Sequence, residues 1–152
     1  MCTINKSIKA KNKVNDLYII QKMEKQLIYN SVKCLNCGEI LISYHRHDYK
    51  TCSCENKTMV DGGLEYLRFG GKDLSLVETN YLYDDEPFEV IREHVFRGGR
   101  GVNGDEPLKY VLLKDINDDW LNAIIDYENC IRPNNKYLKY YNKELEYRKL
   151  NK

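Results

Sequence analysis

The sequence lacks any long apolar segment and carries almost no net charge. It has 152 residues and a formal net charge of +1. No run approaches the roughly 18 consecutive apolar residues of a membrane span. The N-terminal stretch MCTINKSIKAKNKVND also lacks the apolar core of a signal peptide. These absences predict a cytoplasmic protein without a membrane partner, and the length predicts one domain or a small module with an appendage.

The small net charge hides a separation of charge along the chain. Residues 1–60 have a balance of +5, whereas residues 61–95 have a balance of −6. The sequence is therefore unlike a strongly basic nucleic-acid-binding domain. Two interpretations stay open: oppositely charged faces attract one another within the fold, or a basic surface binds nucleic acid and an acidic one binds a protein partner.

Four of the six cysteines lie in two close pairs within residues 34–54. Disulfides are improbable in a reducing compartment. A thioredoxin-like CxxC would stand at a strand-to-helix junction, whereas Ile40 and Ile42 alternate with Leu41 and Ser43 as in a strand. Two cysteine turns joined by a β-hairpin would present four thiolates to a tetrahedral ion. The sequence therefore predicts a Zn²⁺ site made of Cys34, Cys37, Cys52 and Cys54.

Two histidines separate the cysteine pairs, in the run HRHD at residues 45–48. Either imidazole could replace one cysteine as a zinc ligand. Both, however, lie in the middle of the connection, where the chain should turn away from the metal, so we expect neither to bind it. The run could also form a local ion pair, cap a turn or lie near a catalytic water, but no second acid or nucleophile is near it in the sequence.

The segments KCLNCGEILIS, RHDYKTCSC and VDGGLEYLRFGG resemble a small cysteine-rich, zinc-ribbon-like domain of phage and prophage proteins of unknown function. The resemblance spans about residues 31–72 and departs from the family pattern at Glu55, where glycine is usual. The stretch from residue 96 through PLKYVLLKDINDDWLNAIIDYE resembles a C-terminal segment that recurs in phage proteins. These resemblances imply a viral or prophage origin and a metal-binding fold, but no reaction.

Apolar spacing predicts the elements around the cysteine-rich segment. Residues 14–30 have helical spacing, one or two helical turns are expected at residues 64–67, and SLVETNYLY and KYVLLKDI are strand-like. FEVIREHVF is a strand, or a helix if Pro87 lies in its first turn. Asn117 should cap a helix, and a last helix should begin near Pro133.

These elements predict an α+β fold. A zinc-ribbon-like β module would be flanked by an N-terminal helix, a small β-sheet and two C-terminal helices. We expect residues 1–72 to hold the N-terminal helix and the module, and residues 73–152 to form a small α+β region, with one continuous domain as the alternative.

A second candidate site is the segment FRGGRGVNGDEPLKY at residues 96–110. Glycine amides and two guanidinium groups could cradle a phosphate or a nucleotide, and RGG runs contact RNA. The alternative is a mobile hairpin loop whose arginines lie in water. The segment lacks the Gly-Lys-Ser/Thr ending of a P-loop. The candidate ligand-binding residues are Arg97, Gly98, Gly99 and Arg100, together with Arg46 and His47 of the HRHD run.

Three functions remain open from the sequence. The first hypothesis is a phage-encoded, zinc-stabilised accessory protein that binds and inhibits a bacterial host or defence protein in the host cytoplasm. The 13 tyrosines support it, because tyrosine is enriched at interfaces. The second is a nucleic-acid-binding or nucleotide-binding protein that uses the basic termini and residues 97–104. The third is a nuclease or phosphotransfer enzyme that uses HRHD and His94; we expect no enzymatic activity.

Overall fold

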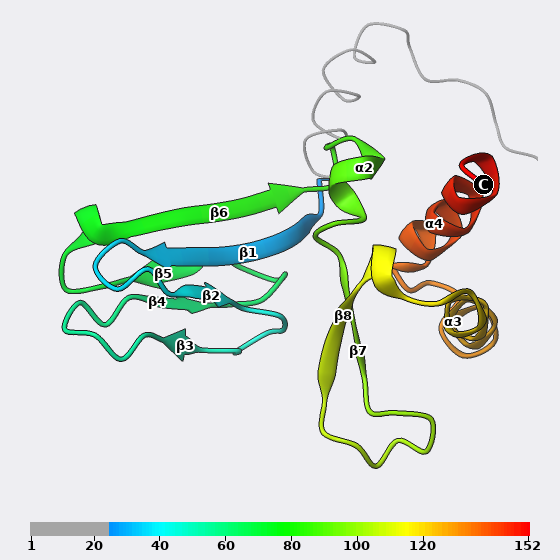
Figure 1. The fold of residues 1–152 in the computed structure, drawn as a ribbon, viewed down its shortest axis with the longest axis horizontal. Coiled ribbons are helices and arrows are strands. Elements are labelled where there is room, and N and C mark those ends of the chain that lie inside the picture. Colours follow the sequence, from blue (N-terminus) through cyan, green and yellow to red (C-terminus); the bar gives the residue numbers. More distant parts are fainter. Residues whose placement is uncertain (1–24) are drawn as a thin grey trace, which may run out of the picture.

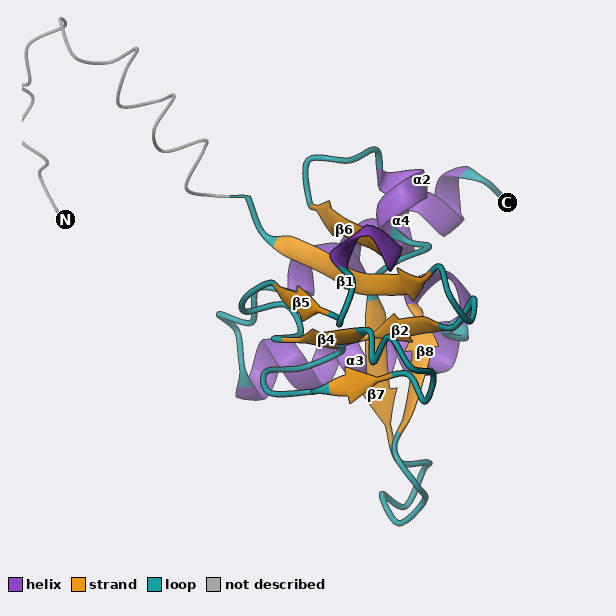
Figure 2. Cartoon of the chain, turned by 90° about the vertical axis from the view of Figure 1, so that its left-hand side faces the viewer, coloured by secondary structure: helices purple, strands orange, loops and turns teal. Residues whose placement is uncertain are grey.

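The structure is a computed structural model, and it describes residues 25–152. Its strands β1 to β6 gather at one end and its helices at the other, with a long hairpin projecting between them (Figure 1). Figure 2 looks at the molecule from the strand side, with α3 and α4 behind the strands. Three α-helices and several small antiparallel sheets make up the described chain, so the predicted α+β class is confirmed.

Two three-stranded antiparallel sheets form the strand end. One has the order β2-β1-β6 and the other the order β3-β4-β5. The first contains β1 (Leu27–Cys34), β2 (Ile40–Ile42) and β6 (Val77–Tyr83). The second contains β3 (Lys50–Thr51), β4 (Met59–Asp61) and β5 (Arg68–Gly70). Between the two sheets lies a small core of Val32, Cys34, Leu41, Cys52 and Val60.

The helical end follows β6 in the chain. It contains α2 (Phe88–Ile91), the hairpin of β7 (Phe96–Gly99) and β8 (Lys109–Leu112), α3 (Asp118–Ile131) and α4 (Leu138–Leu150). Short 3₁₀ helices span Leu74–Leu76 and Leu113–Asp115. A second core joins these elements and contains Ile91, Val95, Leu113, Ile116, Leu121, Ile124, Ile125, Tyr140 and Tyr141.

The strand β1 belongs to both cores. Ile28, at its start, packs in the helical core, whereas Val32 and Cys34, at its end, pack in the small core. Val32 and Cys34 point to the same face because they are two residues apart, whereas Ile28 lies where the register of β1 against β6 shifts, between Leu27 and Tyr29. Along its length β1 pairs with β6, from Leu27 opposite Tyr83 to Cys34 opposite Val77. One strand therefore connects the cysteine-rich end to the helical end.

The predicted helix over residues 14–30 is wrong at its C-terminal end, because β1 begins at Leu27; its residues up to 24 lie outside the described part. Leu27–Cys34 is almost wholly buried and pairs with a strand along each edge, so burial and strand pairing override the helical spacing. Where one or two helical turns were expected, at residues 64–67, a single turn closed by the Tyr66 N–H and the Gly62 carbonyl leads into β5.

Local signals in the C-terminal half were more accurate. The side chain of Asn117 accepts a hydrogen bond of 2.8 Å from the backbone N–H of Trp120 and caps α3, as predicted. The helical alternative for the segment after Pro87 is confirmed at α2. The last helix begins at Leu138, five residues later than expected, because turns at residues 132–138 come first.

Candidate metal centre

Each cysteine pair lies at the turn of its own β-hairpin. Cys34 ends β1, and the chain reverses through Cys37 into β2, whose Ile40 pairs with Lys33. Cys52 and Cys54 lie in the turn between β3 and β4. The prediction that one hairpin joins the two pairs is therefore wrong: β2 and β3 belong to different sheets. Two hairpins, one from each sheet, bring the pairs together.

The first turn is closed by backbone hydrogen bonds. The N–H of Gly38 donates to the carbonyl of Cys34 over 2.7 Å, and the N–H of Cys34 donates to the carbonyl of Glu39 over 2.9 Å. Gly38 has a φ of +78°, a left-handed conformation that suits glycine. The turn therefore holds Cys34 and Cys37 on one side of the hairpin.

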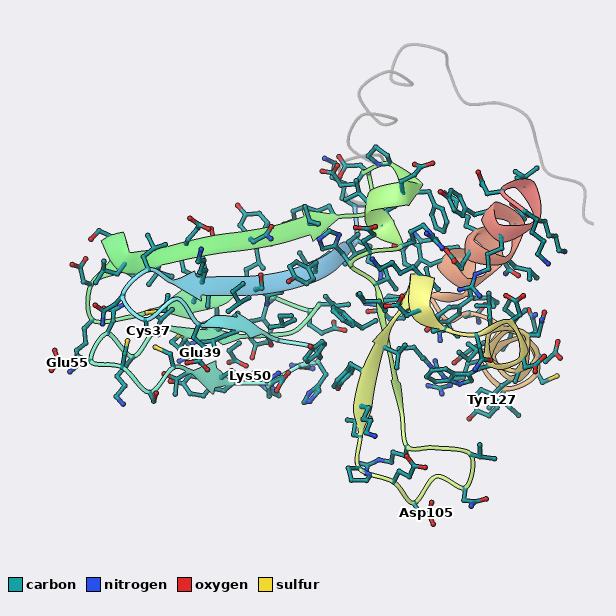
Figure 3. The ribbon with its side chains drawn as sticks, viewed as in Figure 1. Cys37, Glu39, Lys50, Glu55, Asp105 and Tyr127 are labelled. Carbon is teal, nitrogen blue, oxygen red and sulfur yellow. The ribbon has the colours of Figure 1, made fainter. Side chains whose placement is uncertain are left out.

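The sulfur atoms of Cys34, Cys37, Cys52 and Cys54 all lie within 4.8 Å of one another. The Sγ atom of Cys54 is 3.4 Å from that of Cys52 and 3.6 Å from that of Cys34. Cys34 and Cys52 are buried, while Cys37 is exposed at the end of the module farthest from the helices (Figure 3). Four thiolates at this spacing could hold one metal ion in tetrahedral geometry.

The four thiols differ in how easily they lose a proton. A hydrogen bond with the Thr58 side chain lowers the pKa of Cys34 to about 6, and one with the Asn36 side chain lowers the pKa of Cys54. Burial raises the pKa of Cys52. The backbone of Glu39 favours the Cys37 thiolate, but loss of hydration of the Cys37 sulfur and its contacts with the other three cysteines outweigh it and raise the pKa of Cys37 to about 12. A bound cation is what would allow all four to ionise together.

Neither histidine of the HRHD run joins the four thiols. In the described chain, the cluster of potential metal ligands consists of the four cysteines alone. The Nδ1 atom of His47 is 2.9 Å from the hydroxyl of Tyr66, and that of His45 is 3.1 Å from the carbonyl of Arg46. The set of candidate ligands is therefore the one that the cysteine spacing predicted.

The arginine and glycine segment forms the β7–β8 hairpin and its loop. Arg97 donates from Nη1 to the buried carboxylate of Glu128 over 2.8 Å, whereas Arg100 is exposed in the loop. A Cβ on Gly98 would lie 3.2 Å from the Leu108 side chain, and one on Gly99 would lie 2.9 Å from the ring of Trp120. The two glycines thus permit close packing, and Arg97 forms an ion pair with Glu128 inside the protein.

A cavity of about 830 Å³ lies beside Arg97, between the hairpin and the loop that joins α3 to α4. Arg132 and Lys136 line it together with Tyr44 from the cysteine-rich end. This grouping could not be predicted from the sequence, because its members come from segments far apart in the chain. His94, a residue of the predicted enzymatic alternative, hydrogen-bonds through Nδ1 to the carbonyl of Val90 over 2.8 Å.

No helix in residues 25–152 is long and apolar enough to cross a membrane. Comparison with known families shows that residues 26–71 match the model of a domain of unknown function, DUF7695. No curated protein and no solved structure matches the chain. The matched segment holds both cysteine pairs, the HRHD run and β1 to β5, so the similarity to this family covers the candidate metal centre and less than a third of the chain.

Proposed function

We propose that the four cysteines hold a structural Zn²⁺ ion in a zinc-ribbon-like module, and that the protein acts by binding a protein partner. The closed set of four thiol ligands is the observation that supports this most directly. Catalytic zinc sites keep one position for water or substrate and usually contain histidine or carboxylate, whereas structural sites are filled by four protein ligands. Zinc fits the donor set because thiolates favour it over magnesium or calcium.

The metal also has a structural task in this fold. Cys34 and Cys52 are two of the five residues of the small core, so the ion would fix the packing of the sheets as well as the turns. A core this small contributes little stability by itself, and metal binding is then part of the folding energy.

Exposed apolar side chains near the cysteine turns support a protein partner. Leu35, Ile40 and Leu74 are 48%, 60% and 65% exposed, and we call them the knuckle face. The backbone N–H of Leu35 bonds to the carbonyl of Leu76, which brings the first cysteine turn beside the 3₁₀ helix of Leu74. Apolar groups exposed together commonly mark an interaction site. With the resemblance to phage and prophage proteins, we propose a bacterial host or defence protein as the partner.

The metal can be tested by elemental analysis of the purified protein and of two serine variants. We expect one zinc ion per chain, lost together with the native fold in Cys34→Ser. Cys130→Ser is the matched control, because Cys130 is exposed on α3 and outside the cluster. A well-folded protein without bound metal would refute the structural role.

The partner can be tested by affinity capture from a nuclease-treated bacterial lysate. We expect the protein to retain a specific host protein, and the double variant Leu35→Asp/Leu74→Asp to lose it. Val102→Asp is the control, because Val102 is fully exposed at the tip of the β7–β8 loop, away from the knuckle face. If capture depends instead on nucleic acid and disappears with nuclease, the alternative of nucleic-acid binding is favoured.

A further inference from the structure

Two segments that the metal centre does not use lie side by side: the HRHD run and the segment DGGLEYLR at residues 61–68. The Nδ1 atom of His47 is 2.9 Å from the Tyr66 hydroxyl. That hydroxyl donates to Oδ2 of Asp61 over 3.2 Å. A chain of hydrogen bonds therefore runs from an exposed imidazole to a buried carboxylate.

This chain determines the orientation of the imidazole. The Tyr66 hydroxyl has one proton and gives it to Asp61, so its oxygen can only accept from His47. The tautomer of His47 with its proton on Nδ1 completes this chain of hydrogen bonds, and its other nitrogen, Nε2, takes no hydrogen bond from residues 25–152. The side chain of Asp61 is fixed in turn by the backbone N–H of Gly62, over 2.8 Å.

The backbone holds His47 in an unfavourable conformation. Its φ is +63°, and His47 and Lys57 are the non-glycine residues of the described chain with positive φ. Its loop is tied to the neighbouring segment, since the Gly63 N–H donates to the Ser43 hydroxyl over 2.8 Å. A Cβ on Gly63 would lie 2.3 Å from the backbone of His45, so the two segments meet at van der Waals distance. Strain that neighbouring structure maintains is typical of ligand sites.

Two arginines place positive charge around the imidazole. Arg68 has a side chain that is 68% exposed, with Nη1 3.6 Å from Asp61, and Arg46 is exposed beside His47 in the sequence. Burial and Asp61 raise the pKa of Tyr66, whereas the charges of Arg68 and Arg46 lower it, so both guanidinium groups lie within electrostatic reach of this hydroxyl. Two positive charges thus face one buried negative charge.

We propose that Arg46, His47 and Arg68 form a binding site for a phosphate monoester. The guanidinium groups would pair with its oxygens. A phosphate monoester has a second pKa near 6, so near that pH its monoanion can share its remaining proton with Nε2 of His47. Sulfate lacks that proton. This site is separate from the knuckle face and does not depend on the protein partner proposed above.

The test is an NMR titration of the full-length, metal-loaded chain with inorganic phosphate, with sulfate at equal ionic strength as the reference. We expect saturable shifts at the His47 ring and the Tyr66 amide, and weaker binding of sulfate. Arg46→Gln and Arg68→Gln should each weaken phosphate binding about tenfold. His47→Asn should weaken it too while keeping the backbone, because asparagine tolerates the left-handed conformation. Arg100→Gln, which changes an exposed arginine elsewhere, should bind as the wild type does.

Further titrations distinguish the source of the phosphate. Adenosine monophosphate, a 5′-phosphorylated single-stranded oligonucleotide and the same strand without its 5′-phosphate are compared. Tighter binding of the phosphorylated strand than of the mononucleotide would assign a nucleic-acid end as the ligand, and equal binding would assign a small phosphate ester. Shifts that do not saturate, or that Arg100→Gln removes and Arg68→Gln does not, would overturn the proposal.

Discussion

Arg97 and Arg100 lie three residues apart, yet the structure predicts opposite effects for their replacement by alanine. Arg97→Ala removes one of three groups around the carboxylate of Glu128, whose side chain is 0% exposed. The other two are Asn135, which donates over 2.7 Å, and Arg132, whose Nε is 3.5 Å away. Arg100 is exposed in the loop.

The size of the stability loss in Arg97→Ala depends on the groups that still surround the buried carboxylate of Glu128. Removing one partner of a buried ion pair typically costs about 3–5 kcal/mol. Asn135 and the more exposed Arg132 still compensate part of the Glu128 charge, so we expect a loss of about 2–4 kcal/mol for Arg97→Ala. Arg100→Ala should change stability by less than about 0.5 kcal/mol, as surface substitutions usually do.

Urea unfolding followed by circular dichroism measures the difference. With a slope of about 2 kcal/mol per molar urea, the Arg97→Ala midpoint should fall by about 1–2 M, and the Arg100→Ala midpoint should stay where it is. The double variant Arg97→Ala/Glu128→Gln should recover part of the loss, because no unpaired charge is then buried. Equal midpoints for the two single variants would show that Arg97 has no structural role and would restore it as a candidate ligand-binding residue.

Two further predictions concern the backbone and the buried acids. Gly63→Ala should lower the melting temperature by far more than Gly104→Ala, because both have left-handed backbones but only Gly63 has an obstructing neighbour, at 2.3 Å; equal melting temperatures would contradict the close approach of the two loops. Stability should fall as the pH drops below about 4. Burial alone would raise the pKa values of Glu128 and Asp84, but hydrogen bonds and positive charges hold both below their usual range. The stability that these two carboxylates contribute is therefore fully present above their pKa values in the unfolded chain, and it is lost as they take up protons in the folded protein. Thermal melts at pH 7 and pH 3 should show this, with a smaller difference in Glu128→Gln.

The features that the sequence predicted well depend on neighbours in the chain. The two cysteine pairs are each closed by a short turn, so their spacing was enough to predict which four cysteines cluster. The cap of α3 needs only Asn117 and the amide three residues later. Such signals lie within a few residues of one another, and no tertiary contact has to be known to interpret them.

The features that it missed depend on contacts between distant segments. The start of β1 falls within residues 14–30, whose spacing is helical, and the strands on each side of it, β2 and β6, make the extended form favourable. His47 and Tyr66 are separated by 19 residues, and Arg97 and Glu128 by 31. Their side chains meet because loops and helices place them together. Residue type alone therefore indicated Arg97 as a candidate ligand-binding residue. It assigned Tyr66 no role beyond its place in the family pattern.

The position of β1 links the metal centre to the rest of the protein. Ile28 packs in the helical core and Val32 in the small core. The cysteine-rich end and the helical end of the molecule are therefore joined by one continuous strand rather than by a loop. Its partner β6 follows residue 72 in the chain but pairs as far as Cys34. Any force that orders the cysteine turns, including a bound ion, therefore also fixes the strand from which the helical core takes Ile28. The metal centre and the helices should for this reason gain or lose order together.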